Sequence, residues 1–243
     1  MDPDIWTPYC GVAPTPATYL ERWNLDPLVL GVLLVLLILL LRRSDPARRG
    51  LAVAAVAVLV VSFVSPLCAL SSALFSARTV HHVLLVAAAA PLLAWRLPGR
   101  RVGPLAVATL VPAAVFWFWH APDAYAAALS NDGLYWVMQL SLLGSATWFW
   151  MAVRTASAPA AIAALLVSMV LTGLLGALLT FAGAPLYAPH QLTSRAFGLK
   201  PLEDQQIAGL IMWAPAAAIY MVAALTVLGR RLAPDGSGAG RTA

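Results

Sequence analysis

Long apolar runs separated by short polar loops constrain this fold more than any other feature of the sequence. Leu, Val and Ala dominate the runs, and Asp204 is the only Asp, Glu, Lys or Arg within them. A helix of about 20 residues crosses the hydrocarbon core of a bilayer, which is about 30 Å thick. The pattern predicts an all-α integral membrane protein, a bundle of seven transmembrane helices. The predicted spans are residues 27–41, 50–68, 79–95, 103–120, 134–153, 160–182 and 204–229.

The composition excludes a soluble protein. Hydrophobic residues make up 61% of the 243 residues and charged residues only 10%, whereas soluble domains carry about a quarter charged residues. The runs lack the period-two alternation of a membrane β-barrel. The net charge of +5 does not indicate a nucleic-acid partner, because the basic residues form short clusters between runs and no RNA-binding signature is present. The expected environment is a lipid bilayer.

The basic clusters predict the orientation in the membrane. Eleven of the fifteen Lys and Arg residues fall in alternate loops on one predicted side, and four fall on the other. The positive-inside rule places the arginine-rich side in the cytoplasm. The N-terminus is then outside and the C-terminus cytoplasmic, as seven spans require.

Three regions follow along the chain. Residues 1–26 are predicted to form an extracytoplasmic N-terminal arm, residues 27–231 the seven-helix transmembrane domain, and residues 232–243 a disordered cytoplasmic tail rich in Gly and Ser. Asp26 is predicted to cap the first helix, with Pro27 in its first position.

Three local features are predicted inside the helical domain. Residues 69–78 are expected to form a short connector, which is either irregular or a helix lying in the membrane interface, and Pro122 is expected to stop the fourth helix. Asn131-Asp132-Gly133 is expected to form a turn.

All four histidines fall at the predicted outer level of the membrane. His81 and His82 begin the third span, His120 ends the fourth, and His190 lies in the last outer loop. Ionisable groups at membrane depth are rare and usually functional. Imidazole suits copper, and sulfur ligands select Cu(I). The sequence therefore predicts a copper site at His82 and His120, with further candidate ligands nearby: His81, Cys68, Met212 and His190.

Helix geometry selects between the adjacent histidines. On a helix that begins near Phe75, Arg78 and His82 share a face and His81 points about 100° away. His82 is therefore the histidine expected to face the centre of the bundle. The alternative is that each histidine binds water or a backbone carbonyl at the headgroup level, and this alternative is favoured for His190, in a loop expected to be mobile.

Other polar residues at this level have structural alternatives. Cys68 is either an apolar filler or the disulfide partner of Cys10, since both lie on the oxidising side. Asp204 is expected to cap its own helix. Gln205 and Met212 share a helix face and are expected to line a path into the membrane.

Arg78 also has two interpretations. It reaches the outer headgroups, or it holds a carboxylate such as Asp204 or a haem propionate. Tyr125 falls at the same outer level.

Short motifs resemble one known family, the CtaG-type cytochrome c oxidase assembly factors, which are seven-span bacterial membrane proteins. The motifs occur in the family's order and cover about residues 20–230. The matching segments are Trp23 with Asp26-Pro27, Ser65-Pro-Leu67, Val80-His-His-Val-Leu-Leu85, Ala90-Pro-Leu-Leu93, His120-Ala-Pro122 with Tyr125, Pro185-Leu-Tyr187, and Asp204-Gln-Gln206 with Gly209-Leu-Ile-Met-Trp213. The chain departs from the family at Arg78 and Thr79, where the family pattern His-Met-x-x-His has its first histidine and its methionine. Either His81 substitutes for that histidine or the site is altered.

The resemblance implies a non-enzymatic role in maturing a haem–copper oxidase, with copper handled on the outer face of the bacterial plasma membrane. The implied partners are cytochrome c oxidase subunits or other copper carriers. The residues alone leave a second class open, a membrane haem- or quinone-linked redox protein with outer histidines as ligands. No nucleophile, base and acid recur together, so hydrolysis is not expected.

Overall fold

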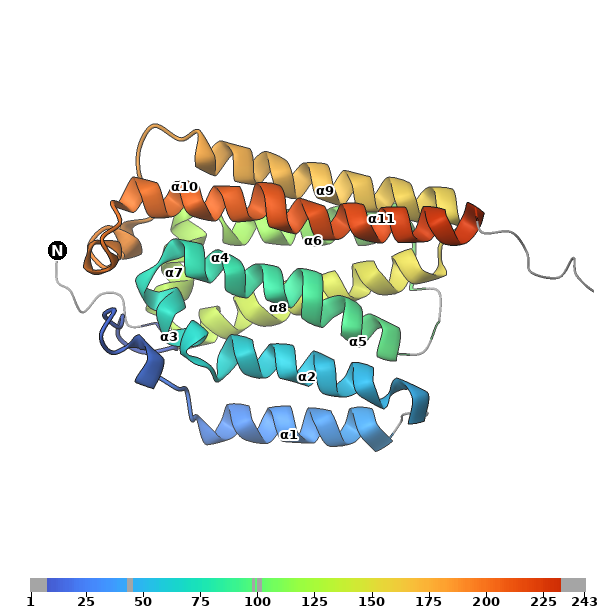
Figure 1. The fold of residues 1–243 in the computed structure, drawn as a ribbon, viewed down its shortest axis with the longest axis horizontal. Coiled ribbons are helices and arrows are strands. Elements are labelled where there is room, and N and C mark those ends of the chain that lie inside the picture. Colours follow the sequence, from blue (N-terminus) through green and yellow to red (C-terminus); the bar gives the residue numbers. More distant parts are fainter. Residues whose placement is uncertain (1–7, 43–45, 98, 100–101, 233–243) are drawn as a thin grey trace, which may run out of the picture.

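A computed structural model describes residues 8–42, 46–97, 99 and 102–232, and within these the chain is helical and contains no strand (Figure 1). The α-helices are α1 (Pro27–Arg42), α2 (Arg49–Phe63), α3 (Pro66–Ala73), α4 (Phe75–Val83), α5 (Ala90–Arg96), α6 (Leu105–Trp119), α7 (Pro122–Ser130), α8 (Asp132–Thr155), α9 (Ala158–Thr180), α10 (Pro201–Ile211) and α11 (Ala217–Leu232). Two π-helical stretches, η4 (Leu84–Ala89) and η7 (Met212–Ala216), join α4 to α5 and α10 to α11. Short 3-10 turns are η2 (Tyr19–Glu21), η3 (Pro46–Arg48), η5 (Ala188–His190) and η6 (Ser194–Phe197).

These elements form an elongated bundle whose helical segments lie side by side along its long axis (Figure 1). Within the described residues, three continuous helices are long and apolar enough to cross a membrane, or up to five if each bent pair counts as one span. The apolar helix α1 has 16 residues and is shorter than these three helices. The helix α8 has 24 residues and is long enough to cross a membrane, but it is less apolar than the three candidate spans. Large apolar side chains such as Leu28 and Val32 of α1 are exposed on the outside of the bundle, as membrane insertion requires.

The arm and the end of α11 lie at opposite ends of the bundle (Figure 1). The end that carries the four histidines is called the histidine end below, and the end at which α1, α5, α8 and α11 finish is called the arginine end. Asp26 caps α1 as predicted, because its Oδ1 accepts a hydrogen bond from Leu28 N at 2.8 Å and Pro27 opens the helix. The predicted disordered tail, except Leu232, and residues 1–7 of the arm lie outside the described residues.

Two of the predicted spans are bent rather than straight. The helices α2 and α3 meet at 43°, and α6 and α7 meet at 72°. Each break precedes a proline that opens the second helix, Pro66 or Pro122, because the residue before proline avoids helical geometry. The prediction that Pro122 stops a helix was therefore incomplete, since the same residue begins α7.

The connector predicted at residues 69–78 is helical, which is one of its two predicted forms, and the turn predicted at residues 131–133 was wrong. Residues 69–78 are divided between α3 and α4, with only Leu74 extended between them. Residues 131–133 are not a free turn, because the Asn131 side chain accepts a hydrogen bond from Leu134 N at 3.0 Å and caps α8. The Asn131 cap allows α8 to begin directly after α7.

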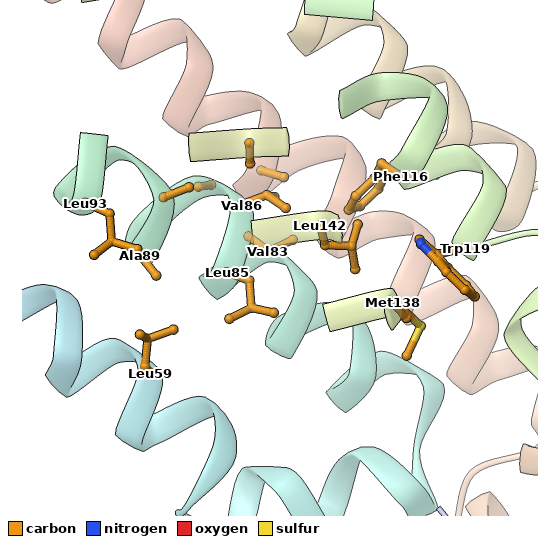
Figure 2. Packing of buried hydrophobic residues seen from close by; sticks show 14 of the residues in the cluster. Leu59, Val83, Leu85, Val86, Ala89, Leu93, Phe116, Trp119, Met138 and Leu142 are labelled. Carbon is orange, nitrogen blue, oxygen red and sulfur yellow. The ribbon is translucent and has the colours of Figure 1, made fainter. Parts of the chain in front are cut away.

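The continuous segment from α4 through η4 to α5 is the centre of the bundle. Of its most apolar 18-residue window, 67% is buried, against 39% for α9 and 22% for α10–α11. Leu59 of α2 lies on one side of this segment, and Phe116 of α6 and Leu142 of α8 lie on the other (Figure 2). The π-helical turns precede Pro91 and contain Pro215, and such widening accommodates a proline without breaking the helix.

A close crossing between α9 and α10 fixes the position of α10. A Cβ atom added at Gly176 would lie 2.6 Å from the carbonyl oxygen of Gly209 and 2.8 Å from the Trp213 nitrogen. A Cβ atom at Gly209 would lie 2.5 Å from the carbonyl oxygen of Gly176. Both positions therefore require glycine, and the contact sets how closely α10 approaches the rest of the histidine end.

The arm folds back over the histidine end. A disulfide joins Cys10 to Cys68 of α3, and the Tyr9 hydroxyl donates to the Asp26 carboxylate. This contact lowers the pKa of Asp26. The Tyr9 ring stacks on Tyr135 of α8 with 5.2 Å between ring centroids, so the arm covers the side chains that lie beneath it.

Candidate functional site

Buried polar side chains gather at the histidine end, among the apolar helices. Each of them is at most 2% exposed, although groups of this kind are seldom buried without partners. This set is called the polar cluster below, and it consists of Arg78, His81, His82, His120, Tyr125, Tyr135, Gln139 and His190.

Asp204 of α10 positions α4, which supplies three members of the cluster. Its Oδ2 accepts a hydrogen bond from Phe75 N at 2.6 Å, and its Oδ1 accepts from Ser76 N at 3.1 Å and Ser76 Oγ at 2.5 Å. The expectation that Asp204 caps its own helix was therefore wrong. It caps the first turn of α4 instead, where free amide groups and the helix dipole favour a carboxylate.

His82 and His120 form a pair across α4 and the end of α6. His82 Nδ1 lies 3.4 Å from His120 Nε2, and the two rings are T-shaped. His120 Nδ1 donates to the Phe116 carbonyl oxygen at 2.6 Å, which leaves the Nε2 lone pair facing His82. His82 Nε2 has no hydrogen-bond partner among the described residues. The prediction that His82 faces the bundle centre agrees with this geometry.

His190 belongs to a separate pair. Its Nε2 is hydrogen-bonded to the Tyr125 hydroxyl, with 2.6 Å between the two atoms. The Phe75 ring lies between the two pairs, 6.3 Å from the His120 centroid and 6.0 Å from the His190 centroid. Burial and the nearby charge of Arg78 lower the pKa of His190 to about 3. The expectation of a mobile, solvated histidine was wrong, because the loop folds inward onto α7.

His81 points away from the pair. Its ring meets Phe63 of α2 edge-on at 5.1 Å between centroids. Neither of its ring nitrogens has a hydrogen-bond partner within the described chain. The adjacent histidines therefore face different helices, as their separation of about 100° around α4 predicts.

The predicted role of Cys68 as a metal ligand is wrong for the disulfide-bonded protein. Its sulfur is bonded to Cys10, so it offers no thiolate. The structure has the alternative pairing that the sequence left open. Cys10 Sγ also lies 3.4 Å from the Tyr135 hydroxyl, which places the disulfide against the polar cluster.

Gln205 and Met212 do not line a path into the membrane. Gln205 Oε1 accepts a hydrogen bond from Leu186 N at 2.7 Å, and its Nε2 donates to the Leu179 carbonyl at 3.3 Å. Gln205 therefore anchors the loop that follows α9. Met212 is fully buried, and its Cβ would lie 3.0 Å from a Cβ at Gly176, which makes it part of the α9–α10 packing.

Arg78 neither reaches headgroups nor holds Asp204. Its side chain is 0% exposed, and its three guanidinium nitrogens have no hydrogen-bond partner among the described residues. Its Cζ atom lies 5.3 Å from the centroid of the Tyr135 ring. The one ion pair within the described residues joins Lys200 and Glu203 at the surface.

Sequence reasoning did not select Tyr135 and Gln139. Both lie on α8 with at most 1% exposure, and both side-chain polar atoms of Gln139 lack partners among the described residues. Their spacing of four residues in an apolar helix is the signal that would have placed them on one face. Within the described residues, no group of three or more His, Cys, Asp or Glu side chains is arranged to hold a metal ion.

Comparison with known families decides the assignment. The model of the cytochrome c oxidase caa3 assembly factor family matches residues 31–233. The chain belongs to this family. The resemblance inferred from the short motifs is thereby confirmed. No curated protein and no solved structure matches the chain.

Membership has direct consequences for the function. An assembly factor for cytochrome c oxidase implies an oxidase-related partner and suggests a non-catalytic role. The apolar helices agree with an assembly factor that is inserted in a membrane.

Proposed function

We propose that this protein supports the assembly of a haem–copper cytochrome c oxidase by holding copper between His82 and His120. The observation that carries the proposal is the separation of 3.4 Å between His82 Nδ1 and His120 Nε2. Metal–nitrogen bonds are about 2.0 Å long, so two nitrogens at this separation can bind one ion. Imidazole nitrogen is a suitable ligand for copper.

The surroundings of His120 support a ligand role. A metal-binding histidine usually donates its other ring N–H to a carbonyl or carboxylate, which fixes the tautomer and the orientation of the ring. The bond from His120 Nδ1 to the Phe116 carbonyl at 2.6 Å has this form. The Tyr187 hydroxyl also donates to the His120 carbonyl at 2.7 Å, so both ends of the residue are held.

The distribution of arginines supports a site at the outer face of the bacterial plasma membrane. Arg42, Arg96, Arg154 and Arg230 lie in the last turns of their helices at the arginine end. The positive-inside rule places that end in the cytoplasm. Copper bound at the histidine end would then meet oxidase subunits or copper carriers on the outer side.

The haem-linked alternative receives no comparable support. The His82 and His120 rings lie 5.2 Å apart in a T-shaped arrangement. A planar macrocycle does not fit between two rings in that contact. We therefore retain copper handling as the proposed function of the pair.

The test is the copper content of protein purified from membranes, loaded with Cu(I) and dialysed against a weak chelator. We expect the wild type to retain about one copper per chain. His82→Ala and His120→Ala should each retain much less, and the double variant none. Each variant is also introduced into a strain that lacks the protein. The variants that retain less copper should restore less oxidase activity.

His190→Gln is the matched control, because His190 is equally buried but contacts Tyr125 instead of the pair. It should retain copper as the wild type does. A wild-type protein that binds no copper, together with a double variant that still supports oxidase assembly, would contradict the proposal.

A further inference from the structure

Arg78 is a buried cation without a counter-charge. Arginine is effectively always protonated in proteins, and an isolated charge is costly to bury unless it is paired. The Arg78 side chain is 0% exposed, and none of its guanidinium nitrogens has a hydrogen-bond partner among the described residues. A native structure that keeps such a group normally supplies an acceptor for it.

The buried Asp204 carboxylate does not supply that acceptor. Asp204 is fully buried, and its two oxygens accept three hydrogen bonds from Phe75 and Ser76. The Asp204 carboxylate therefore satisfies the amide groups at the start of α4. It makes no hydrogen bond with the Arg78 guanidinium, which stays unpaired within the described residues. Arg78 also lies near the N-terminal end of α4, where the helix dipole adds positive potential.

The side chains around Arg78 are polar groups of Tyr, His and Gln, which supply both hydrogen-bond donors and acceptors but no carboxylate. The Tyr125 and Tyr135 hydroxyls and the rings of His81, His82 and His190 are near enough to interact electrostatically with its charge. Both nitrogens of His81 and the amide of Gln139 lack partners among the described residues. A buried cation whose neighbouring side chains supply no negative charge is the arrangement that attracts an anion.

We propose that the polar cluster binds one small inorganic anion of the halide class, chloride, against the Arg78 guanidinium. A single negative charge balances the single positive charge. Water would supply acceptors but would leave that charge uncompensated. Full burial of Arg78 excludes a bulky organic anion. The proposal does not require copper at the His82–His120 pair, because it rests on the burial of Arg78 and on its missing counter-charge.

The first experiment uses full-length protein in detergent after removal of metal with a chelator. Thermal unfolding midpoints are measured while sodium gluconate is replaced by sodium chloride at constant ionic strength. We expect the wild-type midpoint to rise by a few degrees and to saturate, because a ligand that binds only the folded state stabilises it. Arg78→Gln should remove the chloride-dependent rise.

Arg154→Gln is the matched control, because Arg154 donates to the carbonyls of Ala94 and Leu97 and lies at the opposite end of the bundle. Its midpoint should still rise with chloride. An equal rise in Arg78→Gln, or no difference between chloride and gluconate in the wild type, would overturn the proposal.

A second experiment needs no variant and therefore holds even if Arg78→Gln does not fold. Wild-type crystals grown in sodium bromide are measured at the bromine absorption edge. The expected result is an anomalous peak within hydrogen-bond distance of the Arg78 guanidinium. A map without a peak there overturns the proposal.

Discussion

The two ends of the bundle use the same side chain in opposite ways. At the arginine end, Arg96 donates to the Leu40 carbonyl at 2.8 Å, and Arg154 donates to the Ala94 and Leu97 carbonyls at 2.7 and 3.0 Å. At the histidine end, Arg78 is more deeply buried and has no hydrogen-bond acceptor among the described residues.

Helix direction explains the difference. The last carbonyls of a helix have no partner within it, and the C-terminal end carries a negative dipole. Arg96 and Arg154 lie beside such ends, at α1 and α5, and complete them. Arg78 lies near the beginning of α4, where amide groups face outward and Asp204 has already satisfied them. An arginine that completes a helix end is structural, whereas one that has no acceptor indicates a ligand.

The largest effect is expected from removing the Asp204 carboxylate. Asp204→Ala would leave the Phe75 and Ser76 amide groups and the Ser76 hydroxyl buried without an acceptor. We expect the free energy of unfolding to fall by about 4 kcal/mol, measured by denaturant titration in mixed detergent.

The adjacent Glu203→Gln is the control for this prediction. The Glu203 side chain is 46% exposed, and it accepts a hydrogen bond from Lys200 N at 2.8 Å, a bond that glutamine can keep. It should change the stability by less than about 0.5 kcal/mol. Equal effects of the two variants would contradict the assignment of Asp204 as the cap of α4.

The disulfide should have the next largest effect. Cys10→Ser releases the arm from α3, and we expect a loss of about 3 kcal/mol. Cys68→Ser and the double variant should lose the same amount of unfolding free energy, because each of the three variants removes the same Cys10–Cys68 disulfide. A reductant should bring the wild type to the same unfolding midpoint, whereas additive losses in the double variant would exclude a single shared bond.

The smallest effects are expected from replacing Arg154, which has carbonyl acceptors, and Arg78, which has none among the described residues. Arg154→Gln should cost about 1–2 kcal/mol, because two carbonyls lose their donors. Arg78→Gln, measured without chloride, should cost nothing or stabilise the protein, since removal of an unpaired buried charge relieves its desolvation. If Arg78→Gln destabilises the chloride-free protein more than Arg154→Gln does, the contrast between the ends is wrong.

Local signals account for the parts of the site that sequence reasoning predicted. The position of His82 on the inner face of its helix follows from its spacing with Arg78, and the start of α1 follows from Asp26 and Pro27. Contacts between helices account for the failures. Gln205 could not be recognised as an anchor because its partners, such as Leu186 and Leu179, lie on other segments. The number of membrane crossings stays a prediction, with three to five helices meeting the length and composition required.

The sequence by itself determined that this protein is a helical membrane protein of the oxidase assembly family, with its histidines at one end. Apolar runs, helix caps and motifs are properties of neighbouring residues, so they can be read along the chain. Only the tertiary structure decided that His82 meets His120, that Cys68 pairs with Cys10, and that Asp204 caps α4. These contacts depend on how the helices cross and rotate, and bends at proline and glycine contacts set that geometry through packing between distant segments.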